Sequence, residues 1–233
     1  MNRLYLIPTP LGDYSPAEVL PAPVLALIPG IRLFFVEEIR TARRFLSAAG
    51  LKGHIDELEL HELNEHTDRA TIESYAALLG EGDAAVISEA GLPAVADPGA
   101  LLVELAHKKG VEVVPQVGPS SLMLALMSSG MNGQCFAFTG YLPAKKEERK
   151  SAILEIEKIS SRLRQSQIII ETPYRNDSLF ADMLALCKGT TRICVAADLT
   201  LPTAFIRTKS VAEWRKQTPA IGKRPCVFVL MGN

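Results

Sequence analysis

Short apolar runs alternate with amphipathic segments through the first half of the chain. The runs are too short for buried helices and rich in β-branched and aromatic residues, so they predict buried strands. They lie at residues 4–7, 31–36, 58–60, 84–87 and 111–114. Helical periodicity and end signals predict helices between them, including residues 68–79 and 98–109. Strict strand–helix alternation predicts a parallel sheet with helices on both faces.

The pattern changes at Gly130–Gly133, where two glycines flank Met131 and Asn132. Strands are then expected at residues 135–139, 168–170, 193–197, 205–206 and 226–230, with helices mixed among them less regularly. We therefore predict an α/β protein of two domains. Residues 1–132 form a parallel-sheet domain, and residues 133–233 form an α+β domain with a mixed sheet.

The loop that follows the predicted strand at residues 84–87 is unusually long. Ser88 and Glu89 stand at the carboxyl end of that strand, where ligands bind in open α/β sheets. Small residues, prolines and Gly91 leave the backbone open to a ligand. An ordinary turn is the alternative, with Asp97 as helix N-cap and Pro98 as first helical residue. Both can hold, but capping leaves most of the loop unexplained.

Two further loops are expected at the same edge of the sheet. Pro8–Asp13 contains two prolines and a glycine and would form a second wall of the cleft. Gly118–Ser121 joins a strand to a helix amino terminus and makes a cradle for an anion or carboxylate. Each also has a plainer interpretation, a simple turn in the first case and a helix cap in the second.

Charged pairs near other strand ends allow two interpretations. Glu37 and Glu38 either face a ligand or occupy the first turn of a helix, where the dipole favours acids. His61 and His66 are five residues apart, with no cysteine or third histidine nearby, so we predict no metal site. The cluster Lys145–Lys150 could contact phosphates, but its interleaved acids favour a solvated helix face.

The composition excludes some classes of protein. Lys and Arg number 25 against 26 Asp and Glu, so no global basic field announces a nucleic-acid partner, although a local patch could bind one. No run of eighteen apolar residues occurs, and the amino terminus leads directly into a strand, so we expect a cytoplasmic protein without a signal peptide or membrane span. The four cysteines are scattered and predict reduced core residues.

Seven motifs fall in the order found in one methyltransferase fold. They are Thr9–Gly12, Glu37–Arg40, Asn64–Glu65, Ser88–Pro93, Ala96–Gly99, Gly118–Ser121 and Glu171–Arg175. Together they span nearly the whole chain, which resembles the tetrapyrrole-methylase superfamily. Within it, the sequence is most similar to the branch that methylates a ribose 2′-hydroxyl of a cytidine in small-subunit ribosomal RNA.

This resemblance implies a homodimeric enzyme that binds S-adenosylmethionine in a cleft between its two domains. Carried over by position, the cofactor contacts come from three loops and one strand end. They are Pro10, Glu89, Ala90, Gly91, Leu92, Ser120, Ser121 and Ala197. The sequence also departs from the ribosomal branch. Glu38 and Glu89 stand where aspartate is common, and Thr172 and Tyr174 replace serine and histidine, which changes the reach of these groups.

Methylation of a ribose hydroxyl requires an aligned acceptor and removal of its proton. Glu37, Glu38 and Glu65 are the candidate bases, and Arg40 and Arg175 could hold phosphate. The predicted catalytic residues are Glu37, Glu38 and Arg40, and the predicted substrate-binding residues are Asn64, Glu65 and Arg175.

Three functions remain open at this point. The first is methylation of ribosomal RNA, with the small ribosomal subunit as partner, and the motifs Glu37–Arg40 and Asn64–Glu65 favour it. The second is methylation of a tetrapyrrole carbon. The third is a cofactor-binding or ribosome-associated protein without catalytic activity. The near-neutral net charge counts against the first, because RNA enzymes are commonly basic.

Overall fold

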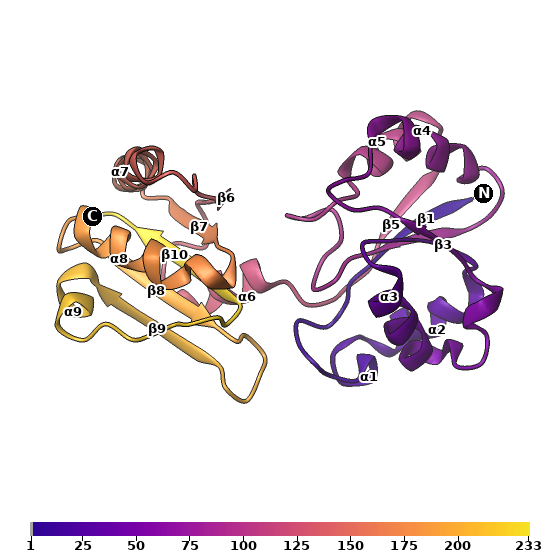
Figure 1. Ribbon diagram of the computed structural model, residues 1–233, viewed down its shortest axis with the longest axis horizontal. Coiled ribbons are helices and arrows are strands. Elements are labelled where there is room, and N and C mark those ends of the chain that lie inside the picture. The colour runs from indigo at the N-terminus through magenta and orange to yellow at the C-terminus, as the bar shows by residue number, and fades with distance from the viewer. Residues whose placement is uncertain (1) are drawn as a thin grey trace. The chain divides into compact units, whose positions relative to one another are not determined.

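The computed structural model describes residues 2–233, which divide into two compact units (Figure 1). The first unit ends at Ser120 and the second begins at Ser121. Sequence patterns place the division later, between residues 132 and 133. The difference is α6 (Ser121–Ser129), whose Leu122 and Ala125 pack into the core of the second unit. This helix therefore belongs with the sheet that follows it.

The first unit is built on a fully parallel five-stranded sheet. Its strands are β1 (Arg3–Ile7), β2 (Leu33–Val36), β3 (Glu59–Glu62), β4 (Ala84–Ile87) and β5 (Glu112–Pro115), in the order β3-β2-β4-β1-β5. The predicted parallel sheet is confirmed. β4 has the predicted bounds and is buried throughout, as expected of a strand covered on both faces.

Helices cover both faces of this sheet. α1 (Pro16–Val19), α2 (Ala22–Leu27) and α3 (Ile39–Leu46) lie on one side, and α4 (Arg69–Leu78) and α5 (Ala100–Lys108) lie on the other (Figure 1). Short helical turns occupy Ile28–Gly30, Ser47–Leu51 and Ile55–Glu57. Successive strand residues serve the two cores alternately, so that Phe34 packs with α2 and α3 while Phe35 packs with α4 and α5.

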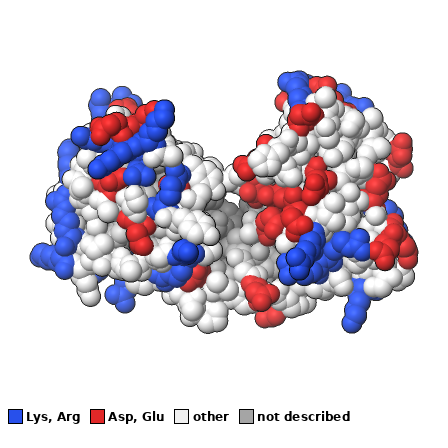
Figure 2. Space-filling model, viewed as in Figure 1, with Lys and Arg blue, Asp and Glu red and all other residues white. Residues whose placement is uncertain are grey.

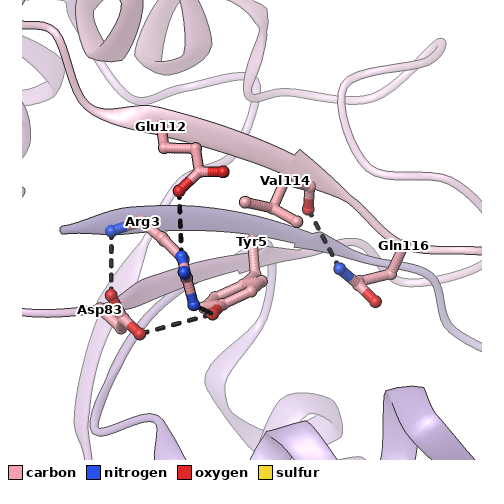
Figure 3. Close-up of polar contacts among 6 residues, drawn as sticks. All are labelled: Arg3, Tyr5, Asp83, Glu112, Val114 and Gln116. Carbon is pink, nitrogen blue, oxygen red and sulfur yellow. Dashed lines mark hydrogen bonds and ion pairs between the residues drawn. The ribbon is translucent and has the colours of Figure 1, made fainter. Parts of the chain in front are cut away.

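A polar network holds the amino ends of three neighbouring strands (Figure 3). The Arg3 backbone N–H donates to Asp83 Oδ1 at 2.9 Å, and its Nε donates to Glu112 Oε2 at 3.0 Å. Arg3 Nη1 also donates to Tyr5 Oη at 3.2 Å. These contacts tie β1 to β4 and β5 at the sheet edge opposite the strands' carboxyl ends. The contacts therefore help to fix the register of these three strands.

The second unit contains a mixed sheet, which confirms the predicted α+β character. Its strands are β6 (Phe136–Tyr141), β7 (Ser166–Ile170), β8 (Arg192–Ala197), β9 (Phe205–Ser210) and β10 (Cys226–Met231), in the order β6-β7-β10-β8-β9. Only the β6–β7 pair is parallel. β9 extends well beyond the two apolar residues that predict it, because an edge strand tolerates the polar sequence that follows them.

Two cores fill the space on either side of this mixed sheet. α6 packs on one face, and α7 (Lys146–Leu163), α8 (Asn176–Leu186) and α9 (Val211–Lys216) pack on the other, with a short turn at Pro173–Arg175. Phe180 meets Trp214 edge to face at 5.4 Å between ring centroids and stacks with Phe228 at 5.9 Å. The buried Trp214 indole donates to the Ile193 carbonyl at 2.9 Å, which satisfies its one polar group.

The structure revises one interpretation of the charged cluster Lys145–Lys150. Arg149 is buried, and its guanidinium contacts Asp182 at 2.7 Å and Ser178 at 3.1 Å. It therefore joins α7 to α8, whereas the remaining residues of the cluster are exposed. A buried arginine pairs with a carboxylate because an unpaired charge would be costly there.

The cysteines are free thiols, three of them buried. Burial raises the pKa of Cys187 and of Cys226 to about 12, so these thiols stay protonated.

Over residues 2–233, no helix combines the length and the apolar character needed to cross a membrane.

Candidate functional site

The first sheet has its topological switch point between β1 and β4. The chain leaves β1 toward β2 on one side and leaves β4 toward β5 on the other, so the connecting helices lie on opposite faces. Such a reversal opens a crevice outside the carboxyl ends of the two strands, and ligands of open α/β proteins bind there. The loops that begin at Pro8 and Ser88 leave the sheet at this point.

These two loops are joined directly by backbone hydrogen bonds. The Thr9 N–H donates to the Gly91 carbonyl at 2.9 Å, and the Gly91 N–H donates to the Thr9 carbonyl at 3.0 Å. The buried Thr9 hydroxyl donates to the Ser88 carbonyl at 3.1 Å. Gly91 has a φ of 86°, which glycine adopts without strain. The structure thus brings Pro10 and the segment Glu89–Leu92 to one place.

The predicted loop Gly118–Ser121 meets the loop Pro8–Asp13 at Pro8. A β-carbon added to Gly118 would lie 2.4 Å from Pro8 Cβ and 2.6 Å from Pro8 Cγ, closer than real atoms approach. Only glycine lets the loop after β5 pass this near. Ser120 follows as the last residue of the first unit, and Ser121 begins α6. The loops after β1, β4 and β5 therefore pack together.

A pocket of about 370 Å³ lies in the first unit beside these loops. Its walls come from the loop after β1, the end of β4 and one side of α3. They include Pro10, Tyr14, Thr41, Arg44, Phe45, Ser88 and Glu89. Sequence reasoning identified Pro10, Ser88 and Glu89 but missed Tyr14 and the α3 residues. The α3 residues could not be placed because the direction a helix presents to a loop depends on the fold.

Three carboxyl groups meet at the ends of β2 and β4. The backbone N–H of Glu89 donates to Glu37 Oε1 at 3.2 Å. Burial, followed by repulsion from Asp97 and Glu89, raises the pKa of Glu37 to about 7. Burial also raises the pKa of Asp97 to about 6, with a hydrogen bond from Ser88 opposing the shift. Glu37 therefore exchanges a proton near neutral pH.

Glu38, unlike Glu37, caps the amino end of a helix. Its two carboxylate oxygens accept the backbone N–H groups of Arg40 and Thr41, each at 2.8 Å, and so cap the amino end of α3. These hydrogen bonds lower the pKa of Glu38. The Thr41 hydroxyl in turn donates to the carboxylate of Glu89. The cap therefore holds α3 where Thr41 reaches the crevice.

The predicted cap of the following helix is wrong. α5 begins at Ala100, and Gly99 precedes it with a φ of 128°, so neither Asp97 nor Pro98 starts the helix. The Asp97 side chain instead belongs with Glu37 and Ser88 at the crevice. A left-handed residue between Pro98 and the helix prevents the usual Asp-Pro start.

The predicted substrate residues lie at different places. Asn64 follows β3, the edge strand, and its side chain accepts the His66 N–H at 2.9 Å to form a turn. Glu65 is exposed beside it, and Arg40 is exposed in the first turn of α3. All three stand at the carboxyl edge of the first sheet. Over residues 2–233, no group of three or more His, Cys, Asp or Glu could hold a metal ion.

Besides Ser121, two predicted residues belong to the second unit, Arg175 and Ala197. Arg175 is held by the buried Glu171, whose Oε1 accepts from Arg175 Nε at 2.9 Å and from the Thr172 N–H at 2.7 Å. Oε2 of Glu171 is buried and makes no hydrogen bond within residues 2–233. Ala197 ends β8 and is fully buried, so the Asp198–Thr200 turn supplies the polar groups there.

Charge is divided unequally between the two units. Residues 1–120 carry 9 Lys and Arg against 17 Asp and Glu, a net charge of −8. Residues 121–233 carry 16 against 9, a net charge of +7. Acidic side chains gather on the face of the first unit that Figure 2 shows, and basic ones on that of the second. The near-zero total conceals a strongly basic second unit.

Comparison with known sequences identifies a family. The chain matches the tetrapyrrole (corrin/porphyrin) methylases over residues 3–214. It is 32% identical over 210 residues to ribosomal RNA small subunit methyltransferase I of Vibrio cholerae, covering 90% of this chain and 69% of that one. The protein of the same name from Thermotoga maritima is 29% identical, with 94% and 95% covered.

The fold has a counterpart among solved structures. The crystal structure of the methyltransferase CobJ matches with a TM-score of 0.65, covering 100% of this chain and 95% of the other at 15% identity. This likeness concerns the fold, and the sequence relatives carry the family assignment. The family match and the sequence relatives show that the chain belongs to the tetrapyrrole methylase family and is a methyltransferase.

Proposed function

We propose that the protein transfers a methyl group from S-adenosylmethionine to the ribose 2′-hydroxyl of a cytidine in small-subunit ribosomal RNA. The observation that carries this proposal is the crevice at the switch point, where three loops and three carboxyl groups meet. The names of the sequence relatives support the RNA substrate. The basic second unit supports it too, because RNA is a long polyanion.

The residues at the crevice fit the proposed cofactor. Gly91 and Gly118 let main-chain groups approach a nucleoside, and the carboxylates of Glu37 and Glu89 suit a positively charged sulfonium. The pocket volume lies within the usual range for small-molecule sites, about 300–1,000 Å³. The cofactor supplies an electrophilic methyl group when bound. We assign its contacts to Pro10 and to the residues from Glu89 to Leu92, with Ser120, Ser121 and Ala197 as further proposed contacts.

Among the candidate bases, we assign proton removal to Glu37. A general base works best when its pKa lies near the working pH, and Glu37 meets this condition. Glu38 is occupied in capping α3, which makes it a positioning residue. Arg40, exposed in the first turn of α3, is assigned to a substrate phosphate, and Asn64 and Glu65 at the end of β3 are assigned to other polar groups of the substrate. We further propose a homodimer in the cytoplasm.

Transfer of label separates the candidate functions. S-adenosylmethionine with a labelled methyl group is offered with small ribosomal subunits, naked ribosomal RNA and uroporphyrinogen. The proposal predicts label in RNA, recovered after nuclease digestion as 2′-O-methylcytidine. Label in the tetrapyrrole alone would assign the function named by the family description. Label in none of them would leave a binding protein.

Glu37 is tested by its amide variant in the same assay. Glu37→Gln keeps the hydrogen-bond acceptor for the Glu89 N–H but cannot take a proton, so we expect turnover to fall by about 10²–10⁴-fold. Affinity for adenosylhomocysteine should change little. Glu81→Gln, which removes an exposed carboxylate before β4 and outside the pocket lining, is the matched control and should keep full turnover. Full turnover by Glu37→Gln would refute the assignment of Glu37 as the general base.

A further inference from the structure

We propose that a basic groove at one end of the second unit anchors the phosphate backbone of ribosomal RNA, separately from the predicted cofactor contact at Ala197 in the same unit. The groove encloses about 820 Å³ and lies where β8 begins and β9 ends. Its polar lining includes Lys188, Thr190, Arg192, Thr208, Lys209 and Ser210. The inference rests on the proposed RNA substrate and adds a second contact surface to it.

The antiparallel pairing of β8 with β9 places the cations together. Arg192 pairs with Ser210, and the neighbouring Ile193 pairs with Lys209. Lys188 precedes β8 in the loop after α8 and is exposed. Cations from distant parts of the sequence therefore line one groove at the end of the sheet, with Lys209 on the face that carries Trp214 and Arg192 on the face that carries Gly130.

Two of these cations are held in position. Nζ of Lys209 lies 5.0 Å from the ring centroid of the buried Trp214. The Arg192 guanidinium contacts Met231 Sδ at 3.4 Å and the Gly130 carbonyl at 3.5 Å. A cation that is already ordered loses less side-chain entropy when a phosphate binds.

Negative charge in the groove is small. Of the described residues that line it, Glu213 alone is acidic, and its carboxylate accepts the Ser210 N–H at 2.8 Å as part of the α9 capping box. The lining therefore carries two more positive than negative charges. The hydroxyls of Thr190 and Thr208 add groups that can donate to phosphate oxygens.

Further cations lie beside the groove. Asn233 connects the groove to the end of α7, because its amide donates to the Thr190 carbonyl at 2.8 Å and its carbonyl accepts from Ser161 at 3.2 Å. Arg162 follows Ser161 directly, Arg164 lies two residues further along, and both are exposed. Positive charge at this end of the unit therefore extends beyond the residues that line the groove.

The groove is separate from the predicted cofactor contact in the same unit. It lies at the Arg192 end of β8, whereas Ala197 ends the strand, roughly 17 Å away at about 3.4 Å per residue. That length corresponds to several nucleotides of backbone. RNA is the occupant that matches several cations at one end of a unit with a net charge of +7, since phosphates repeat along its chain.

Binding of a fluorescein-labelled single-stranded RNA from the small subunit, measured by anisotropy at several salt concentrations, tests the groove. We compare the wild type with Lys188→Gln/Lys209→Gln. The control, Lys108→Gln/Lys109→Gln, removes two exposed lysines at the end of α5. The groove variant should bind roughly tenfold more weakly and lose about 1.4 from the salt slope, at about 0.7 per phosphate. The control should bind like the wild type.

Equal RNA binding by the groove variant and the control would overturn the proposal that the groove binds RNA. Competition by polyglutamate as effective as that by unlabelled RNA would also overturn it, in favour of an acidic protein partner. Methyl transfer to small subunits is measured in parallel, where the groove variant should show a raised KM and an unchanged kcat. If the wild type binds RNA through these lysines but transfers no methyl group to it, the proposed function is refuted. RNA binding by the groove would then still be supported.

Discussion

Replacing Glu37 by glutamine should stabilise the first unit at high pH and change its stability little at low pH. In the folded protein the pKa of Glu37 is raised from 4.5 to about 7, chiefly by burial and then by repulsion from Asp97. Folding therefore favours the protonated form. The stability that this group contributes is fully present below pH 4.5 and is lost as pH rises through 7.

The magnitude follows from the shift. About 2.5 pKa units at about 1.4 kcal/mol each give about 3.5 kcal/mol, which solvent screening of this half-buried carboxyl reduces to about 3 kcal/mol of stability lost above pH 7. Glutamine removes this loss because it does not ionise, and its side-chain oxygen still accepts the Glu89 N–H. The variant should exceed the wild type by about 3 kcal/mol at pH 8 and by less than about 1 kcal/mol at pH 5.

Thermal melting at the two pH values measures this difference. We expect the transition of the first unit to rise by roughly 10 °C at pH 8 and by only a few degrees at pH 5. Glu81→Gln, which removes an exposed carboxylate before β4, should melt like the wild type at both pH values. An equal shift at pH 5 and pH 8, or a lower melting temperature at pH 8, would refute the reasoning.

Three further substitutions test separate parts of the structure. Gly118→Ala should lower the stability of the first unit by about 1–3 kcal/mol, because its β-carbon would overlap Pro8, and an unchanged melting temperature would contradict the close loop packing. Glu38→Ala removes the α3 cap and should lower the melting temperature of the first unit slightly, with faster hydrogen exchange confined to the first turn of α3. Phe180→Ala should cost about 3–5 kcal/mol in urea unfolding followed by the fluorescence of Trp214, and a cost below 1 kcal/mol would contradict its central place in the core.

Local sequence patterns predict much of the fold. Apolar runs such as residues 84–87 predict the parallel strands, because a strand covered on both faces must be apolar throughout. The full length of β9 could not be predicted, since polar residues on an edge strand resemble a loop. α6 could not be assigned to its unit, because the packing of Leu122 and Ala125 on the second sheet is a long-range contact.

The candidate site was predictable at its backbone and less so at its side chains. Strand ends placed Pro10 and Glu89 at one edge, and the structure joins their loops through Thr9 and Gly91. The participation of Thr41 depends on the orientation of α3, which no local pattern records. The charge division was hidden for another reason, because the net charges of −8 and +7 nearly cancel in the total.

Calorimetric titration with adenosylhomocysteine tests the cofactor crevice most directly. Wild-type protein should bind one molecule per chain, and Gly118→Ala, which forces apart the loops after β1 and β5, should bind at least tenfold more weakly while remaining folded at the temperature of the titration. The absence of binding heat from the wild type, or equal affinity in the variant, would contradict a cofactor site formed by these loops.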